Sequence, residues 1–216
     1  MVSRLDHDAD VRSHPMSTAR WLLYLGLAAA LCACKKAPAT PPWASSMAVS
    51  HDRKLIYATD PDNDLVVVFK ARTEDKLAEV KVGRDPERIA LGSDGTIYVS
   101  NRGSRSVSVI RRQEWRESAR IPVGLEPVGL AVSPDNHFLY VVNSTSIEDP
   151  ENGTLVAIDL RTHQQHWALA IGPEPREIRL LGEHRASVLL HKDHAVIEVD
   201  LDMRKIVSRR VLLSQR

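Results

Sequence analysis

The feature that most constrains this chain is a unit of about 42 residues that occurs four times in succession. The clearest example is Gly124–Asn143, in which the apolar runs Val128–Val132 and Phe138–Val142 flank the turn Ser133–Asn136. Two runs of β-branched and aromatic residues joined by a Pro/Asp/Asn turn predict a pair of antiparallel strands. Repetition at this spacing constrains the architecture more than any single residue does.

Each unit contains four short apolar segments, and we predict that each segment is a strand. The first strands are Met47–Val49, Ile89–Leu91, Leu130–Val132 and Ile178–Leu180; the second are Leu55–Thr59, Thr96–Ser100, Phe138–Val142 and Ala186–Leu190; the third are Leu65–Phe69, Ser106–Ile110, Thr154–Ile158 and Ala195–Val199; the fourth are Leu77–Val82, Ser118–Val123, Trp167–Ile171 and Ile206–Leu212. The units therefore cover approximately residues 44–83, 84–124, 125–172 and 173–213.

A tyrosine marks one position of the repeat. Tyr57, Tyr98 and Tyr140 are 41 and 42 residues apart, and we align Leu189, 49 residues further on, with this position in the fourth unit. The insertion Ser146–Gly153 in the third unit explains most of the extra length. Because it is polar and rich in turn-forming residues, we predict a longer surface loop there.

Four short strands in a unit of this length are typical of a β-propeller blade. A single four-stranded sheet leaves both faces partly apolar, so each blade must pack against a neighbour. We therefore predict an all-β propeller fold made of four four-stranded antiparallel blades.

Two recurring motifs resemble a known family. The segments Tyr98–Asn101 and Tyr140–Asn143 read YVSN and YVVN, and each is followed by a further apolar strand. The linkers Val82–Pro86, Val123–Pro127 and Ile171–Pro175 share the pattern (Val/Ile)-Gly-x-x-Pro. Together these motifs resemble the YVTN-type β-propeller repeat, and the resemblance covers residues 44–213.

The number of blades departs from that family. Its members typically close with seven blades, whereas this sequence supplies four, and the motif fades to Tyr57–Asp60 in the first unit and to Val188–His191 in the fourth. We therefore expect an incomplete, N-terminal part of a larger ring. The chain is truncated, its ends are wrongly assigned, or another chain completes the ring. An open arc exposes two apolar blade faces, so we also expect self-association.

The N-terminal region has the layout of a secretion signal. We interpret residues 1–15 as a leader or as residues upstream of a true start at Met16, and residues 16–33 as a signal peptide. Its apolar run Trp21–Leu31 spans only about 16 Å as a helix, too short for a hydrocarbon core of ~30 Å. A short positive region, a short apolar run and small residues are typical of a signal peptide.

The end of that run, Leu31-Cys32-Ala33-Cys34, resembles the lipobox of bacterial lipoproteins. The resemblance implies cleavage before Cys34, lipidation of its thiol and acylation of the new amino terminus, which together anchor the chain to a membrane. The alternative is an ordinary secreted protein cut near Ala33. Residues 34–43 are predicted to be a Pro/Ala-rich tether. Lys35 follows Cys34 in place of an acidic residue, which favours the outer membrane over the inner one.

Composition excludes several classes of function. Basic and acidic residues number 29 and 28, so no general electrostatic attraction for nucleic acid exists. Cys32 and Cys34 are the two cysteines, which excludes a disulfide framework, a cysteine zinc site and a Cys-x-x-Cys-His haem attachment after Lys35.

The candidate binding residues lie in the loops between blades and between second and third strands, which in a propeller meet at one mouth of the channel. Guanidinium groups there suit carboxylate or phosphate ligands. The alternative is that these loops are polar only because they are solvated. The predicted set is Arg84, Arg88, Asn101, Arg102, Asn143 and Arg176.

Other groups of polar residues give weaker predictions of a metal or catalytic site. The acidic segment Asp60–Asp64 lacks the glycine and distal glutamate of a calcium loop, so we interpret it as a solvated turn. The pairs His163/His166 and His191/His194 lie in turns or strands without a third ligand. We find no nucleophile elbow, P-loop or dinucleotide motif, and we predict no catalytic residue, metal or cofactor.

These observations favour a non-catalytic, lipid-anchored propeller of the cell envelope that presents its mouth to a protein, peptide or polymer ligand. The alternative is the N-terminal propeller of a periplasmic enzyme or redox protein, lactonase-like, quinoprotein-like or cytochrome-linked, whose catalytic part is not among these residues. DNA binding is disfavoured by the balanced charge.

Overall fold

The computed structural model describes residues 45–112, 114–146, 149 and 151–212, which all belong to one compact unit, Pro38–Arg216. The predicted leader, signal peptide, lipidation site at Cys34 and tether lie outside the described residues. So do Ala44 and Leu213, at the two ends of the predicted repeats.

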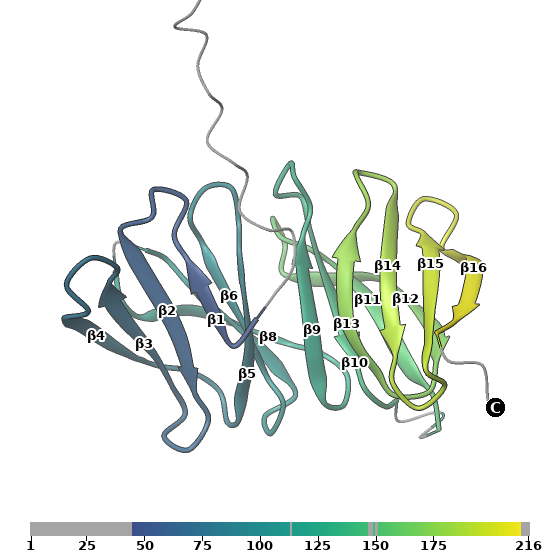
Figure 1. Ribbon diagram of the computed structural model, residues 1–216, viewed down its shortest axis with the longest axis horizontal. Helices are drawn as coiled ribbons and strands as arrows, with labels where there is room; N and C mark the ends of the chain where they lie inside the picture. Colours follow the sequence, from purple (N-terminus) through teal and green to yellow (C-terminus); the bar gives the residue numbers. More distant parts are fainter. Residues whose placement is uncertain (1–44, 113, 147–148, 150, 213–216) are drawn as a thin grey trace, which may run out of the picture. The chain divides into compact units, whose positions relative to one another are not determined.

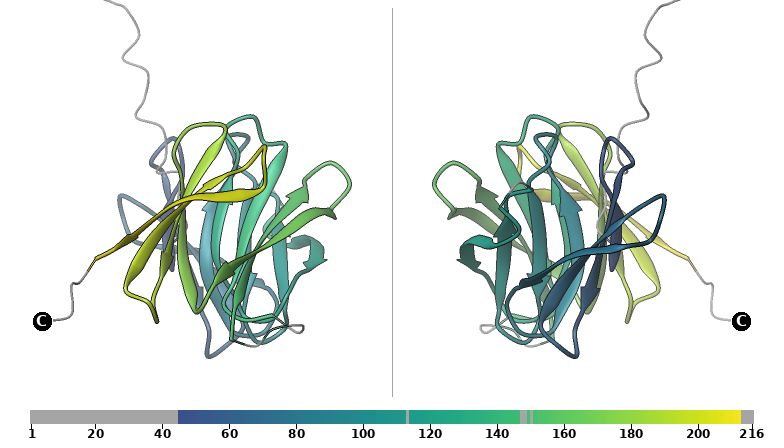
Figure 2. Two further views of the ribbon diagram at one scale, coloured as in Figure 1. Left: turned by 90° about the vertical axis from the view of Figure 1, so that its right-hand side faces the viewer. Right: turned by 90° about the vertical axis from the view of Figure 1, so that its left-hand side faces the viewer.

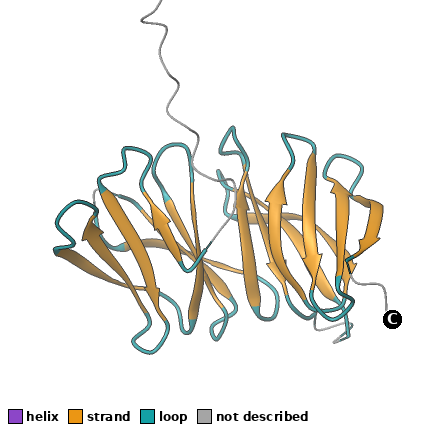
Figure 3. Ribbon diagram, in the orientation of Figure 1, coloured by secondary structure: helices purple, strands orange, loops and turns teal. Residues whose placement is uncertain are grey.

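The described residues form strands without any helix (Figures 1 and 3). Sheet by sheet, the strands are β1 (Met47–Val49), β2 (Leu55–Asp60), β3 (Leu65–Lys70) and β4 (Lys76–Lys81); β5 (Pro86–Leu91), β6 (Ile97–Asn101), β7 (Ser106–Ile110) and β8 (Glu117–Pro122); β9 (Pro127–Val132), β10 (Phe138–Asn143), β11 (Gly153–Asp159) and β12 (Gln164–Gly172); β13 (Pro175–Leu180), β14 (Arg185–Leu190), β15 (Ala195–Asp200) and β16 (Lys205–Val211). Each set of four is one antiparallel sheet in chain order, which confirms the predicted four-stranded blades.

The blades pack on one another in chain order. The first strands β1, β5, β9 and β13 lie innermost, with β5 against β9 and β9 against β13. Three apolar clusters fill the three interfaces between successive blades. The fourth strands lie at the outer edge, and every residue of β16 is exposed. Figure 1 shows the first and fourth sheets at opposite ends of this row.

The repeat also appears in the backbone conformation. Every described non-glycine residue with a positive φ falls on one of four recurring turn positions. The turns between third and fourth strands, for example, place Glu74, Trp115, His163 and Arg204 at φ values of 59°, 46°, 57° and 54°. Because the residue types differ so much, the sequence pattern alone does not reveal this regularity.

A bulge begins the innermost strand of the later blades. Pro86 pairs with Asn101 and Arg88 with Ser100, which leaves Glu87 as the extra residue. Val128 and Arg176 occupy the same place at the start of β9 and β13. A bulge redirects the side chain that carries it, so these three positions differ in environment from the regular strand residues.

The fourth unit requires one correction. Tyr57, Tyr98 and Tyr140 pair with Ala48, Ala90 and Ala131 on their first strands. The equivalent pair in the fourth blade is Arg179 with Ser187. Ser187 therefore occupies the tyrosine position, and the alignment with Leu189 is wrong by two residues. The third blade's longer loop and the loss of the aromatic residue hid this register.

Candidate ligand-binding site at the propeller mouth

The linkers between blades and the loops between second and third strands meet at one end of the unit, as predicted. The Arg102 amide donates to the Asp85 carbonyl over 2.8 Å, and the Ser144 amide donates to the Glu126 carbonyl over 2.9 Å. The His191 amide makes the same bond to Glu174 over 2.9 Å. In each case a linker residue with positive φ receives the bond, so this end has a regular, hydrogen-bonded rim.

A glutamate, Glu87, lies among the predicted arginines at this rim. Burial raises the pKa of the Glu87 carboxyl above its ordinary value, and its side chain is 28% exposed. The positive charges of Arg88, Arg102 and Arg176 oppose that shift of the pKa. The three guanidinium groups, which come from the second and fourth blades, are therefore close enough to act on one carboxyl group.

Two buried polar atoms of this cluster have no hydrogen-bond partner. They are Oε2 of Glu87 and Nε of Arg88. The nearest charge contact joins Arg88 Nε to Glu87 Oε1 at 4.0 Å, too long for a hydrogen bond. Buried polar atoms are normally satisfied, so this pair points to a place where a further polar group is accommodated.

The other arginines are held by their surroundings. Arg102 Nη2 donates to Glu126 Oε2 over 3.0 Å and thereby links the second blade to the linker before the third. Arg84 Nη2 donates to the Gly103 carbonyl over 3.0 Å. Arg176 Nη2 lies 3.9 Å from Glu174 Oε2. A guanidinium group has five N–H donors, so each keeps donors for an acidic ligand after these contacts.

Two of the predicted ligand-binding residues, Asn101 and Asn143, are fully buried. Asn101 Nδ2 donates to Ser108 Oγ over 2.8 Å, and Asn143 Nδ2 donates to Thr154 Oγ1 over 3.0 Å. A Cβ atom on Gly83 would lie 2.6 Å from the Asn101 side chain, and one on Gly124 would lie 2.6 Å from Asn143. The asparagine and the glycine of the repeat thus form one packing contact, in which both asparagine side chains are buried.

The acidic segment is a hydrogen-bonded turn, as predicted. Asp60 accepts bonds from the backbone and side-chain amides of Asn63, over 3.2 and 2.9 Å. Asp64 Oδ1 accepts the Asp85 amide over 2.9 Å. The carboxylates are therefore used by the loop and its neighbouring linker.

Each of the two histidine pairs has one member in a tight turn. His163 and His194 adopt positive φ in tight turns. His191 Nδ1 lies 3.4 Å from Glu174 Oε2, and the His191 and His194 rings are 6.3 Å apart. Within the described ranges no group of three histidine, cysteine or acidic residues is arranged to hold a metal ion.

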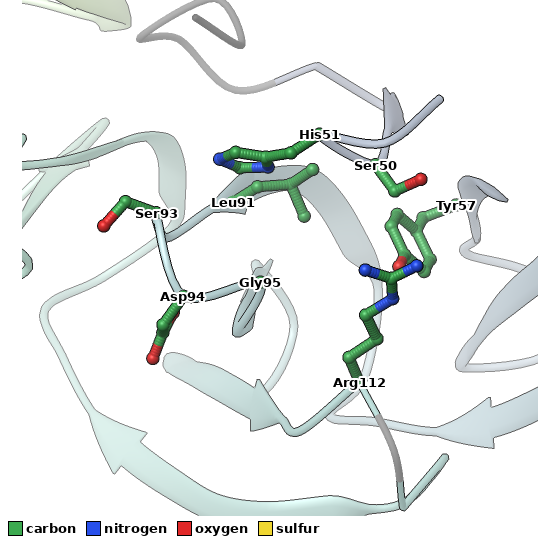
Figure 4. A pocket seen from close by; sticks show the side chains of 8 residues that line it. All are labelled: Ser50, His51, Tyr57, Leu91, Ser93, Asp94, Gly95 and Arg112. Carbon is green, nitrogen blue, oxygen red and sulfur yellow. The ribbon is translucent and has the colours of Figure 1, made fainter. Parts of the chain in front are cut away.

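A small cavity lies at the opposite end, between the first two blades (Figure 4). Its volume is about 90 Å³, enough for water molecules and too small for a drug-sized ligand, which takes ~300 Å³ or more. Arg112, which lines the cavity, donates to Asp52 Oδ2 over 2.7 Å, and this bond lowers the pKa of the Asp52 carboxyl. We interpret this pair as a contact that joins the two blades.

The sequence analysis predicted Arg88, Arg102 and Arg176 at the propeller mouth, but it missed Glu87. Its position just after the linker proline was the available signal, because the equivalent Arg176 was selected there. The sequence could not show that Glu87 is the bulge residue or that its carboxyl group is partly buried.

The comparisons with known proteins agree with this fold. The sequence matches no protein-family model and no curated protein. Among solved structures it is similar to the hydrazine synthase of Kuenenia stuttgartiensis, with a TM-score of 0.71 and 25% sequence identity. The similarity covers 83% of this chain and 52% of that chain, so this protein spans about half the length of its structural neighbour. The blades and their order make it a β-propeller-type protein.

In the described part of the chain, no helix is long and apolar enough to span a membrane.

Proposed function

We propose that this protein is a non-catalytic binding platform of the bacterial envelope, and that its propeller mouth binds a protein, peptide or polymer with exposed carboxylate or phosphate groups. The observation that carries the proposal is the placement of arginines at this mouth: Arg88 Nε lies 4.0 Å from the partly buried Glu87, and the charges of Arg102 and Arg176 also act on that carboxyl group. Guanidinium forks that are already positioned recognise planar anionic groups through paired hydrogen bonds. A rigid ring of blades presents such loops in a fixed arrangement.

The envelope location rests on the N-terminal sequence. We propose that Cys34 is lipidated after signal cleavage, that the membrane is the first partner of the chain, and that the repeats belong to the YVTN type. Replacement of Cys34 by alanine should abolish incorporation of labelled palmitate and shift the protein from the membrane fraction to the soluble one. Unchanged labelling of Cys34→Ala would contradict the anchor.

The binding role is tested by titrating a fluorescent hexaglutamate peptide onto the detergent-extracted protein. The variant Arg88→Gln/Arg102→Gln/Arg176→Gln should bind at least tenfold more weakly than the wild type, and wild-type binding should weaken with salt. The matched control, Arg111→Gln/Arg116→Gln/Arg161→Gln, removes three exposed charges elsewhere and should bind normally. Equal binding by both variants, or no binding by the wild type, would contradict the proposal.

The second candidate is the propeller part of a periplasmic enzyme or redox protein. The observation that favours it is the structural similarity to hydrazine synthase, of which this chain covers about half. Sequencing the native gene past the codon for Arg216 tests this candidate. Further repeats together with a Cys-x-x-Cys-His motif would support it, and a stop codon there would contradict it.

A further inference from the structure

The second blade, which carries Glu87, is covered on both sides. Apolar clusters fill its interfaces with the first and the third blade. Figure 2 views the unit from its two ends, with the fourth sheet nearest the viewer on the left and the first on the right. The packing of the second blade therefore does not depend on what covers the two end blades.

The buried oxygen of the Glu87 carboxyl has no partner. Arg88 Nε lies 4.0 Å from Glu87 Oε1, beyond hydrogen-bond distance, and Glu87 Oε2 is buried without a donor. Burying a carboxylate without a hydrogen bond costs far more than burying the neutral acid. The same burial raises the pKa of this carboxyl group. The folded protein therefore holds Glu87 in a place that disfavours its charge.

Four charged groups act on the Glu87 carboxyl. They are Asp85 in the linker before β5, Arg88 on β5, Arg102 in the loop after β6 and Arg176 on β13. The three arginines favour the ionised carboxyl, whereas the negative charge of Asp85 favours the neutral one. A ligand anion bound to these arginines offsets their charge and adds a negative charge beside Glu87, so it also favours the neutral carboxyl.

We propose that Glu87 controls the affinity of the mouth for anions: it opposes binding while it is ionised, and it takes up a proton from solvent when an anionic ligand group binds the arginines beside it. This inference rests on the anion binding proposed above. Because the two events are linked, the anion and the proton strengthen each other's binding by the same factor. The affinity for anions therefore rises as the pH falls from neutral toward the ordinary pKa of glutamate.

A probe whose own charge does not change with pH tests the proposal. A fluorescent hexapeptide of cysteic acid keeps its sulfonate groups ionised throughout this pH range. The detergent-extracted wild type should bind it about tenfold more tightly near the ordinary pKa of glutamate than at neutral pH. Glu87→Gln should bind it equally tightly at both. The matched control Glu183→Gln, an exposed glutamate in the turn between β13 and β14, should keep the wild-type pH dependence.

Histidines at the mouth offer a different source of pH dependence. His191 Nδ1 lies 3.4 Å from Glu174 Oε2, which lies 3.9 Å from Arg176 Nη2, and the His194 ring is 6.3 Å from that of His191. The variant His191→Gln/His194→Asn, with asparagine where φ is positive, separates the two sources. If Glu87 is responsible, this variant should keep the wild-type pH dependence.

Calorimetric titration in buffers with different heats of ionisation measures the proton directly. Net proton uptake on binding is expected for the wild type and should be absent in Glu87→Gln. Equal protease resistance at each pH would show that the variants are folded. Wild-type binding that does not change with pH, or a pH dependence lost with the histidines and kept in Glu87→Gln, would overturn this inference and leave the proposed anion binding standing. No binding by the wild type at any pH would overturn both.

Discussion

The third and fourth blades have the same backbone and different outward faces. Both contain four antiparallel strands, and their third turns place His163 and Arg204 at nearly equal φ angles of 57° and 54°. Yet Tyr140 is 5% exposed in the interface, while its equivalent Ser187 lies on an uncovered face. Turn conformation and the inward-facing core therefore determine the fold of a blade. The residues on its outward face determine what the blade packs against.

The largest expected effect comes from giving the fourth blade the face of the third. Arg179→Ala/Ser187→Tyr/Glu198→Ala makes that face apolar, so molecules should associate through both ends and form open-ended assemblies. Light scattering should show a mass that grows with concentration. The control Glu151→Ala/Arg161→Ala/Thr162→Tyr alters exposed loops of the third blade and should keep the wild-type mass. A triple variant with that same mass would contradict the role of these residues.

The next effect concerns stability at the equivalent positions themselves. Tyr140→Ala removes a buried ring that lies 6.1 Å from Trp167 and should lower the free energy of unfolding by about 3–5 kcal/mol. Ser187→Ala should change it by less than about 0.5 kcal/mol. Denaturant unfolding of both variants measures the difference. Similar losses would mean that the fourth blade's outward face is covered in solution.

A third test uses the buried asparagine. The third blade has Asn143 against Gly124, whereas the fourth has Leu190 against Gly172. Since Asn143 Oδ1 has no hydrogen-bond partner, Asn143→Leu should cost less than about 1.5 kcal/mol. Asn143→Asp buries an unpaired charge and should cost about 3 kcal/mol or more. Thermal unfolding ranks the two variants, and a greater loss for leucine would show that the amide is required.

The smallest expected effects are changes in how the melting temperature depends on pH. They compare Glu87, at the mouth, with Asp52, at the opposite end of the blades. Because burial raises the pKa of Glu87 in the folded protein, the ionised group costs stability once the pH rises through that pKa. Glu87→Gln should therefore raise the melting temperature at neutral pH, and the gain should vanish below the ordinary pKa of glutamate.

Asp52, at the opposite end, should behave in the reverse way. The bond from Arg112 lowers its pKa, so its contribution to stability is present above the ordinary pKa of aspartate and is lost as the pH falls through the folded value. Asp52→Asn should lower the melting temperature at neutral pH and have less effect in strong acid. Melting curves from strong acid to neutral pH that run in the same direction for both variants would contradict these environments.

Much of the fold could be predicted from the sequence, because alternating apolar runs and recurring turns determine where strands begin and end. The position of Ser187 could not be predicted, since the tyrosine that marks the repeat is absent and a longer loop precedes it. The burial of Asn101 and Asn143 was missed because asparagine at the end of a strand is also typical of an exposed loop. Arg88, Arg102 and Arg176 were found by residue type, whereas Glu87 depends on a bulge that only the register reveals.

The most direct test of the difference between the third and fourth blades compares the light-scattering mass of the Arg179→Ala/Ser187→Tyr/Glu198→Ala variant with that of the wild type. We expect the mass of the variant to grow with concentration, because its fourth blade then carries the outward face of the third. A variant with the wild-type mass at every concentration would contradict the role of that face.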